Sequence, residues 1–276
     1  MLPIPTRTLS DGRSIPVIGF GTHPMTDEQS ETAVASALDL GYRLIDTASL
    51  YRNEVGVGRG IARSGVDRSD IFLTTKLRGG DQGLLETKEG LRGSLQRLDL
   101  EYVDLYLIHW PMPSVNKYVD AWRAMIELRE EGLAHSIGVS NFNEAHLDRL
   151  LSETGVSPVI NQIELHPAWA QAHLRDVDAR HNIVTESWSP IGRGIALEQY
   201  PPVAEAARAH DVTPAQVVLR WHLQLGALPI PKAWSIEHQR ENLDVFNFDL
   251  SPEEMTTFES IAQERMDEDP ETFVEL

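Results

Sequence analysis

The 276-residue chain contains no cysteine. This absence excludes disulfide bonds, thiolate catalysis, and zinc or iron–sulfur centres held by cysteine ligands. A chain without cysteine is typical of a reducing compartment, so we expect a cytoplasmic protein.

Long apolar runs and an excess of positive charge are also lacking. No run approaches the ~20 apolar residues that span a membrane. The N-terminal sequence MLPIPTRTL has no charged segment followed by an apolar region, so we expect no signal peptide. Lysine and arginine total 24 against 42 acidic residues, which gives a net charge of -18. This balance argues against non-specific binding to nucleic acid or to anionic membranes.

Motifs of several enzyme classes are missing as well. The first predicted strand is not followed by G-x-G-x-x-G, and neither G-x-S-x-G nor H-E-x-x-H occurs. The cluster Gly56-Val57-Gly58-Arg59-Gly60 resembles a phosphate loop, but it has the wrong spacing and lies in a helix-like segment. With 41% hydrophobic and 24% charged residues, the composition is that of a globular protein. The length suits one α/β barrel domain over residues 1–276.

Short apolar runs alternate with amphipathic stretches along the chain. A hairpin is predicted first, from Thr8–Leu9 to Ser14–Ile15 across an Asp-Gly turn. Eight runs typical of buried parallel strands follow, at residues 17–21, 43–48, 71–77, 102–110, 135–141, 159–165, 183–190 and 227–232. Helical patterns lie at 28–40, 87–98, 117–131 and 144–153, and begin again at Thr213-Pro214 and Ser251-Pro252. This alternation predicts a (β/α)₈ barrel, with a doubly wound open sheet as the alternative.

Polar side chains recur where the predicted strands end. Because the carboxyl ends of the strands meet at one mouth of a barrel, we expect these side chains to lie close together. They are Asp46, Lys76, His109, Asn141, Gln162, Trp188 and Lys232, and Tyr51 can fold back over the same mouth. Each has an ordinary explanation when taken singly, such as a helix cap for Asp46 or a core position for His109. Their recurrence at one depth favours a functional site.

These residue types permit a limited range of chemistry. One histidine per strand is a weak metal-binding pattern, so we expect no metal ion. Glycoside hydrolysis would need a second carboxylate, for which Glu164 is the nearest candidate. A tyrosine beside a lysine beside an aspartate is a proton-donor arrangement, in which the Lys76 ammonium should lower the pKa of Tyr51 while Asp46 holds Lys76 charged. With His109 orienting a carbonyl oxygen, this is general-acid chemistry on a C=O group, and the hydride must come from elsewhere.

Eight motifs in this order resemble those of aldo-keto reductases. They are GFGT (19–22), DTASLYRNE (46–54), TTKL (74–77), LIHWP (107–111), IGVSNF (137–142), NQIELHP (161–167), SWSPIGRG (187–194) and IPK (230–232). The chain is most similar to the bacterial 2,5-diketo-D-gluconic acid reductase type, also over residues 127–142 and 241–250. The resemblance implies a TIM barrel that binds NADPH across its mouth. It assigns catalysis to Asp46, Tyr51, Lys76 and His109, with Tyr51 as the acid.

The resemblance also implies a cofactor site. Ser140, Asn141 and Gln162 would hold the nicotinamide carboxamide, and Trp188 would stack on the ring. The complete expected set is Thr22, Asp46, Ser140, Asn141, Gln162, Trp188, Ser189, Pro190, Ile191, Gly192, Arg193, Lys232, Ala233, Trp234, His238, Arg240, Glu241 and Asn242.

The chain departs from the family at the expected 2′-phosphate end. The family commonly has a hydroxyl residue after the lysine and an arginine six positions beyond it. Here Ala233 and His238 occupy those positions, with Arg240 two residues further on. Because a hydroxyl donor and a guanidinium fork are lost, we expect NADPH to be preferred over NADH more weakly than a complete motif would give.

The substrate side of the pocket is less constrained. The expected lining residues are His23, Tyr51, Arg78, His109, Trp110 and Trp169. Arg78 stands where many relatives have an aromatic residue, so it indicates an anionic carbonyl substrate unless it is simply a solvated arginine on a Gly-Gly loop. The acidic tail, residues 264–276, either frays or folds over the pocket.

Three functions remain open from the sequence. The first is an NADPH-dependent reductase of aldehydes and ketones, which include keto acids, diketones and keto sugars, and the four intact catalytic positions favour it. The second is a cofactor-binding regulatory or structural barrel without turnover. The third is a metal-dependent hydrolase on the same fold. We expect a monomer with a small carbonyl substrate and with neither nucleic acid nor membrane as a partner.

Overall fold

Eight parallel strands form the wall of a barrel in the computed structural model, which describes residues 4–193 and 196–275. The strands are β3 (Phe20–Gly21), β4 (Leu44–Asp46), β5 (Phe72–Leu77), β6 (Val103–Ile108), β7 (Ala134–Ser140), β8 (Ile160–Glu164), β9 (Val184–Trp188) and β10 (Leu228–Ile230). They pair in chain order, and hydrogen bonds from Gly19 N to Pro229 O (3.1 Å) and from Gly21 N to Pro231 O (3.0 Å) join the first strand to the last. The predicted (β/α)₈ barrel is confirmed, because a doubly wound sheet would not pair its strands sequentially.

Some residues of the predicted features lie outside the described ranges. They are residues 1–3 of the N-terminal sequence, Gly194 at the end of the motif SWSPIGRG, and Leu276 at the end of the acidic tail.

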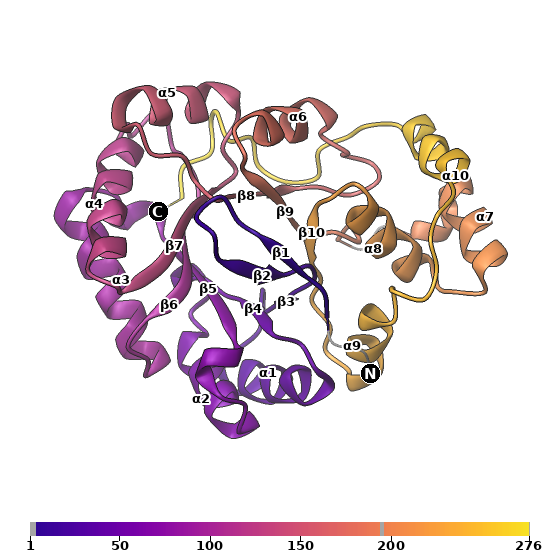
Figure 1. The fold of residues 1–276 in the computed structure, drawn as a ribbon, viewed down its shortest axis with the longest axis horizontal. Coiled ribbons are helices and arrows are strands. Elements are labelled where there is room, and N and C mark those ends of the chain that lie inside the picture. The colour runs from indigo at the N-terminus through magenta and orange to yellow at the C-terminus, as the bar shows by residue number, and fades with distance from the viewer. Residues whose placement is uncertain (1–3, 194–195, 276) are drawn as a thin grey trace.

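Helices surround the strands on the outside of the barrel (Figure 1). They are α1 (Asp27–Leu40), α2 (Glu54–Ser64), α3 (Leu84–Leu98), α4 (Tyr118–Glu130), α5 (Glu144–Thr154), α6 (Ala172–Arg180), α7 (Pro201–His210), α8 (Pro214–Gln224), α9 (Ile236–Leu243) and α10 (Pro252–Thr257). Short 3₁₀ turns occur at Ser49–Tyr51, Arg68–Asp70, Gly79–Asp81, Leu197–Gln199 and Phe258–Ser260. The predicted starts at Thr213 and Ser251 are confirmed, since both residues form capping boxes.

Three helices were not predicted from the sequence. Helices α6 and α9 are short and mostly polar, so their apolar periodicity is weak. Helix α6 also begins after Gln171, whose side chain does not cap it. Helix α7 begins at Pro201, a favourable first position, but its apolar face is made largely of alanine.

The N-terminal hairpin covers one end of the barrel (Figure 1). Strands β1 (Thr6–Thr8) and β2 (Ser14–Pro16) pair antiparallel, with Thr8 opposite Ser14, which confirms the predicted Asp-Gly hairpin. Leu9 and Ile15 are buried with apolar side chains of the barrel interior. Because the hairpin occupies the amino-terminal end, the mouth at the carboxyl ends of the strands is the open one.

The glycine cluster of α2 serves close helix packing. A Cβ added at Gly56 would lie 2.0 Å from the carbonyl oxygen of Asp27, and one at Gly58 would lie 2.1 Å from that of Leu98. These glycines let α2 approach α1 and α3 backbone to backbone. The segment is therefore a packed helix and not a phosphate loop.

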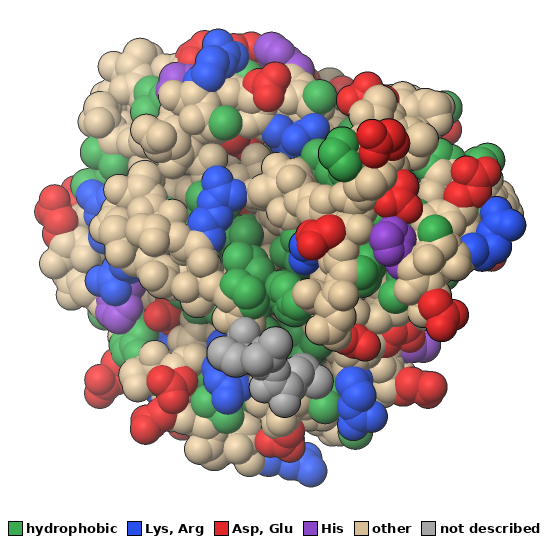
Figure 2. Space-filling view, turned by 45° about the vertical axis from the view of Figure 1, so that its right-hand side comes forward, with side chains coloured by type: hydrophobic (Ala, Val, Ile, Leu, Met, Phe, Trp, Pro, Cys, Tyr) green, Lys and Arg blue, Asp and Glu red, His purple; other side chains and the backbone are tan. Residues whose placement is uncertain are grey.

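The outer surface reflects the acidic composition. Figure 2 shows acidic side chains scattered over the visible face with basic ones between them, and not gathered into one patch. Among the described residues, no helix combines the length and the apolar character needed to cross a membrane.

Candidate active site

A cavity of about 720 Å³ opens at the carboxyl ends of the strands. Its lining includes most of the catalytic, cofactor and substrate residues predicted from the sequence. These are His23, Asp46, Tyr51, His109, Trp110, Asn141, Gln162, Trp188, Ser189, Pro190, Ile191, Gly192, Arg193 and Lys232. The structure therefore brings residues from the whole length of the chain together at one mouth.

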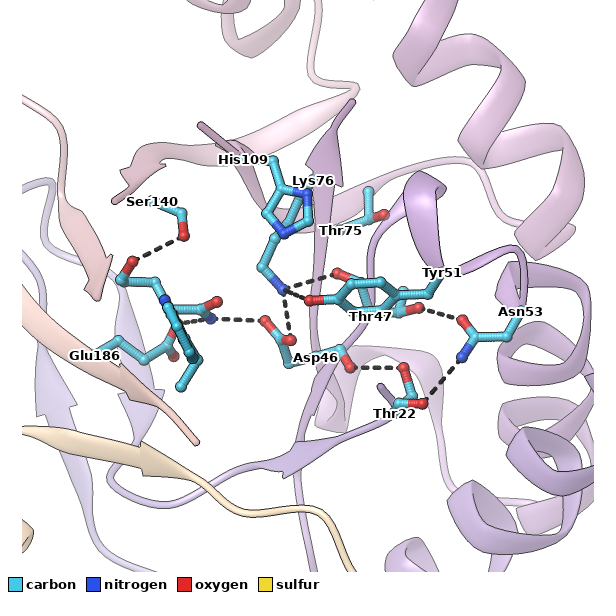
Figure 3. Close-up of polar contacts among 12 residues, drawn as sticks. Thr22, Asp46, Thr47, Tyr51, Asn53, Thr75, Lys76, His109, Ser140 and Glu186 are labelled. Atoms are coloured by element: carbon cyan, nitrogen blue, oxygen red, sulfur yellow. Dashed lines mark hydrogen bonds and ion pairs between the residues drawn. The ribbon is translucent and has the colours of Figure 1, made fainter. Parts of the chain in front are cut away.

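Asp46, Lys76 and Tyr51 form a connected group on the floor of this cavity (Figure 3). The Lys76 ammonium lies 2.6 Å from Asp46 Oδ1 and 3.3 Å from Tyr51 Oη, and it also donates to the Thr47 carbonyl oxygen at 3.1 Å. Lys76 is completely buried and Asp46 is 4% exposed. Because water has little access to these three side chains, the electrostatic interactions among them are strong.

Burial and the ion pair have opposite effects on Lys76 and Tyr51. Burial alone would lower the pKa of Lys76, but Asp46, Tyr51 and Glu186 together outweigh it, so the pKa is raised and the ammonium form is held. Burial raises the pKa of Tyr51, and the Lys76 ammonium opposes this shift only in part. The prediction that the pKa of Tyr51 falls is thus wrong in its net direction. Tyr51 remains a protonated phenol, as a proton donor must be.

A hydrogen-bonded turn fixes the position of Tyr51. Tyr51 is the last residue of the 3₁₀ turn Ser49–Tyr51. Asn53, two residues later, accepts a hydrogen bond from Thr47 Oγ1 (2.8 Å) and donates one to the Thr22 carbonyl oxygen (3.1 Å). Thr22 Oγ1 in turn donates to the Asp46 carbonyl oxygen at 3.0 Å. The loops after β3 and β4 are therefore tied together beneath the phenol. Thr22 itself is buried below the cavity and does not line it.

Two histidines flank the Tyr51 ring. His109 meets it edge-on, with the ring centroids 5.7 Å apart, and the His23 ring lies 4.8 Å away. Partial burial, together with the cations Arg193 and Lys76, lowers the pKa of His23 to about 4, although the outer face of that ring is open to solvent. His23 is therefore neutral at physiological pH.

Gln162 joins two carboxyl groups inside the barrel. Its amide nitrogen donates to Asp46 Oδ2 at 2.8 Å and to Glu186 Oε2 at 2.6 Å. Since both protons of the side-chain amide are used, the side-chain carbonyl oxygen of Gln162 is left to accept a hydrogen bond from a ligand in the cavity. Glu186 was missed in the sequence, because it lies in the middle of a strand pattern, VTESW.

The amide of Asn141 is oriented by its neighbours. Its nitrogen donates to the His109 carbonyl oxygen (3.0 Å) and to Ser140 Oγ (3.1 Å), while Trp188 Nε1 donates to its oxygen (2.8 Å). Ser140 is buried beneath this layer, and its hydroxyl donates to the Gln162 carbonyl oxygen of the main chain at 2.8 Å. The amides of Asn141 and Gln162 and the Trp188 indole thus form a polar and aromatic wall that fits a planar carboxamide-bearing ring.

A buried histidine anchors the loop that follows β9. His222 donates from Nε2 to the Pro190 carbonyl oxygen (3.0 Å) and accepts from Ser187 Oγ at Nδ1 (3.1 Å). Burial lowers the pKa of His222 to about 3, so the ring is neutral and this tautomer is fixed. Arg193, further along the loop, donates to Ser189 Oγ and forms an ion pair with Asp267 at 2.6 Å.

The distal end of the expected cofactor site is more open. Lys232 lines the cavity and its ammonium lies 4.6 Å from the centroid of the exposed Trp234 ring. His238 and Arg240 are exposed on α9, Ala233 and Asn242 are buried, and Glu241 accepts from Thr213 Oγ1. Lys232 makes no ion pair among the described residues, which leaves its charge for an anionic ligand. Of the residues expected at this end, Lys232 lines the cavity, whereas Ala233, Trp234, His238, Arg240, Glu241 and Asn242 do not.

Two expected substrate residues do not line this cavity. Arg78 pairs with Asp81 at 3.1 Å. Trp169 lines a neighbouring, much smaller hollow together with Glu164. Glu164, the candidate second carboxylate, accepts from the Met266 amide at 2.8 Å and contacts His166 Nε2 at 3.0 Å, so it holds the tail and does not face the Tyr51 phenol.

The C-terminal tail folds over the pocket, which decides between the two alternatives left open by the sequence. Glu264 N donates to the Ala168 carbonyl oxygen at 2.6 Å, and the Arg193–Asp267 pair ties the tail to the loop after β9. The Phe273 ring packs against Trp110 with centroids 4.6 Å apart, and both line the cavity. The tail therefore forms one wall of the site.

A metal-centred site finds no support in the described parts of the chain. No group of three or more histidine, aspartate or glutamate side chains there is arranged to hold a metal ion.

Comparison with known proteins finds similarity over nearly the whole chain. The model of the Aldo/keto reductase family matches residues 17–263. The chain is 47% identical over 274 residues to the 2,5-diketo-D-gluconic acid reductase B of Corynebacterium sp. (strain SHS752001), which covers 99% of each chain. A crystal structure of a Gox0644 mutant in complex with NADPH superposes with a TM-score of 0.92, 44% identity, and coverage of 96% of this chain and 97% of that one. The Bombyx mori aldo-keto reductase in complex with NADP gives a TM-score of 0.90 at 33% identity, over 95% of this chain and 94% of that one.

Glu186 yields a prediction about stability. Burial and the nearby Asp46 carboxylate raise the pKa of Glu186 from 4.5 to about 8. Because the folded state then binds a proton that the unfolded state releases, Glu186 lowers stability progressively as pH rises from about 4.5 to about 8, by at most about 1.4 kcal/mol per pH unit. Glu186→Gln keeps an acceptor for Gln162 and removes the titration. The free energy of unfolding of Glu186→Gln, minus that of the wild type, should therefore increase between pH 5 and pH 8 and then level off.

Urea unfolding of both proteins at several pH values measures this difference. The exposed Glu205→Gln on α7 is the matched control and should show no such trend. A difference for Glu186→Gln that stays flat with pH would contradict the assignment.

Proposed function

Because this chain belongs to the aldo/keto reductase family and is thus an oxidoreductase, we propose that it reduces aldehydes and ketones to alcohols with NADPH, using Tyr51 as the general acid. The observation that carries the proposal is the placement of Tyr51 Oη 3.3 Å from an ammonium that is itself 2.6 Å from a buried carboxylate, on the floor of the cavity. This arrangement supplies a proton at the place where a carbonyl oxygen can lie.

NADPH, when bound, supplies the hydride that the carbonyl carbon accepts. The protein supplies the other half of the reaction. Tyr51 donates its proton to the carbonyl oxygen, and the Lys76 ammonium stabilises the phenolate that results. Asp46 holds Lys76 charged and in place, and His109 donates a hydrogen bond that orients the oxygen. Gln162, Asn141 and Trp188 hold the carboxamide and the ring face of the cofactor.

The position of Arg78 bears on which carbonyl substrates we propose. Arg78 pairs with Asp81 and does not line the cavity, so the argument for an anionic substrate loses its cation. The lining includes the rings of Trp110 and Phe273 and the neutral His23, and the lining cation Arg193 is paired with Asp267. We therefore propose neutral aldehydes and ketones as the better substrates. Keto acids remain comparison substrates, because a relative is named for the reduction of a diketo acid.

Tyr51→Phe tests the proposed acid. The variant loses the only transferable proton of this side chain and keeps its ring, so kcat for a simple aldehyde should fall by ~10²-fold or more. NADPH affinity, measured by fluorescence titration, should change by less than about threefold. Tyr102→Phe, at the opposite end of β6, is the matched control and should retain full activity.

Two outcomes would contradict the proposal. A folded Tyr51→Phe protein with wild-type kcat would remove Tyr51 as the acid. A wild-type protein that binds NADPH but consumes none with aldehydes, ketones, diketones or keto acids would be a cofactor-binding barrel without turnover.

The preference for NADPH over NADH should be moderate. Lys232 lines the cavity and is the cation that we assign to the 2′-phosphate, while Ala233 and the exposed His238 provide neither a hydroxyl nor a guanidinium fork. The ratio of the apparent affinities for NADPH and NADH should therefore lie below ~10³. Lys232→Ala should weaken NADPH binding by ~10-fold and leave NADH binding nearly unchanged. A wild-type ratio above ~10³, or equal losses for both cofactors in Lys232→Ala, would show that another residue reads the phosphate.

A further inference from the structure

The C-terminal tail brings a carboxylate into the active site. From α10 the tail runs past α6 towards α5 (Figure 1), where Glu271 contacts His146 and Asn143. The last described residue is Glu275, which is only 3% exposed. A charged side chain is rarely buried so completely without a partner.

Glu275 has two partners, and one of them belongs to the catalytic group. Its Oε2 accepts a hydrogen bond from the Gly79 amide. Its Oε1 lies 2.6 Å from His109 Nδ1, and the ring N–H departs from the line to this oxygen, so the attraction is chiefly that of an ion pair. Packing here is tight, because a Cβ added at Gly79 would lie 2.5 Å from the carbonyl oxygen of Glu275.

The contact determines where the protons of His109 can be. A lone pair on Nδ1 would be repelled by a carboxylate oxygen at this distance, so Nδ1 carries a proton. Because Nδ1 is buried against Glu275, Nε2 is the nitrogen available to the cavity. A neutral imidazole protonated at Nδ1 could only accept at Nε2, whereas a carbonyl oxygen needs a donor.

The balance of charges in the site also favours His109 with both ring nitrogens protonated. The groups around the floor of the site are Asp46, Lys76, Glu186, Glu275 and His109. Asp46 and Lys76 neutralise each other, and Glu186 is protonated at neutral pH. A neutral His109 would leave the Glu275 charge buried without compensation, and this is costly.

We propose that Glu275 is a positioning residue that holds His109 as an imidazolium through the 2.6 Å contact with Nδ1, so that Nε2 presents a charged donor to the substrate oxygen opposite Tyr51. The inference rests on the proposed carbonyl reduction for its kinetic consequences. If Glu275 has this role, efficient turnover requires the tail to lie across the mouth of the cavity, since only then does the carboxylate reach His109.

Glu275→Gln tests the proposal, because it keeps the shape of the side chain and removes its charge. We expect kcat to fall by ~10-fold or more, with less than about a threefold change in KM for NADPH. The high-pH limb of the kcat profile should move to lower pH by about one unit or more. Glu275 also contributes to the raised pKa of Tyr51, so the limb reports on both Tyr51 and His109, and the NMR measurement below assigns the change to His109. Glu275→Asp should restore the wild-type position of the limb, with only part of kcat.

Glu271→Gln is the matched control, since it removes another tail carboxylate that contacts His146 and not the catalytic group. It should leave kcat and its pH profile unchanged. A loss of kcat in Glu275→Gln without a shift of the pH limb would indicate that Glu275 only anchors the tail, and would overturn the proposal.

Nitrogen-15 NMR of His109 provides a readout that needs no turnover. Both ring nitrogens should be protonated in the wild type at neutral pH, and one of them should lose its proton in Glu275→Gln. An unprotonated Nδ1 in the wild type would overturn this inference while leaving the proposed reductase function intact. Absence of turnover in the wild type would instead overturn the proposed function.

Discussion

The Lys76 ammonium and the Asp46 carboxylate lie 2.6 Å apart in the interior of the barrel, and the chemistry of the site depends on this pair. Its geometry follows from strand register. Asp46 on β4 is opposite Thr74 on β5, and Lys76, two residues further along, points to the same face at the mouth. Removing two charges from water is costly, and here the loss is offset by hydrogen bonds from Gln162 to Asp46 and from Lys76 to the Thr47 carbonyl oxygen. In the proposed reaction, Tyr51 acts as an acid because a fixed cation lies beside its oxygen.

The same interior contains more carboxyl groups than cations, and each has a defined state. Asp46 is paired with Lys76, Glu186 is kept protonated by burial, and Glu275 is paired with His109. Two of these acids come from strands of the barrel, whereas the third comes from the end of the tail. In our proposal the barrel supplies the acid Tyr51, and the tail supplies the charge that makes His109 a donor. Closure of the pocket and assembly of the proposed catalytic group are then one event.

Most of the candidate site could be predicted from polar residues at the carboxyl ends of the predicted strands. The alternation of side chains along a strand can be read from local sequence, and parallel strands of a barrel all end at the same mouth. This pattern identified Asp46, Lys76, His109, Asn141, Gln162 and Trp188 before any coordinates. It did not find Glu186, which lies inside a strand pattern, or Glu275, whose contact with His109 joins residues far apart in the chain. The pKa of Tyr51 was predicted in the wrong direction, because the balance between burial and a neighbouring charge depends on the packing around both groups. The placements of Arg78 and Trp169 likewise depended on loop packing.

The central claim is that a buried ammonium enables the phenol to act as an acid, and the turnover of Lys76→Met tests it most directly. Methionine is close to lysine in length and carries no charge. For protein that unfolds cooperatively and binds NADPH within about threefold of the wild type, we predict that kcat for a simple aldehyde falls by ~10²-fold or more. A folded, NADPH-binding Lys76→Met protein with kcat within about threefold of the wild type would contradict the account.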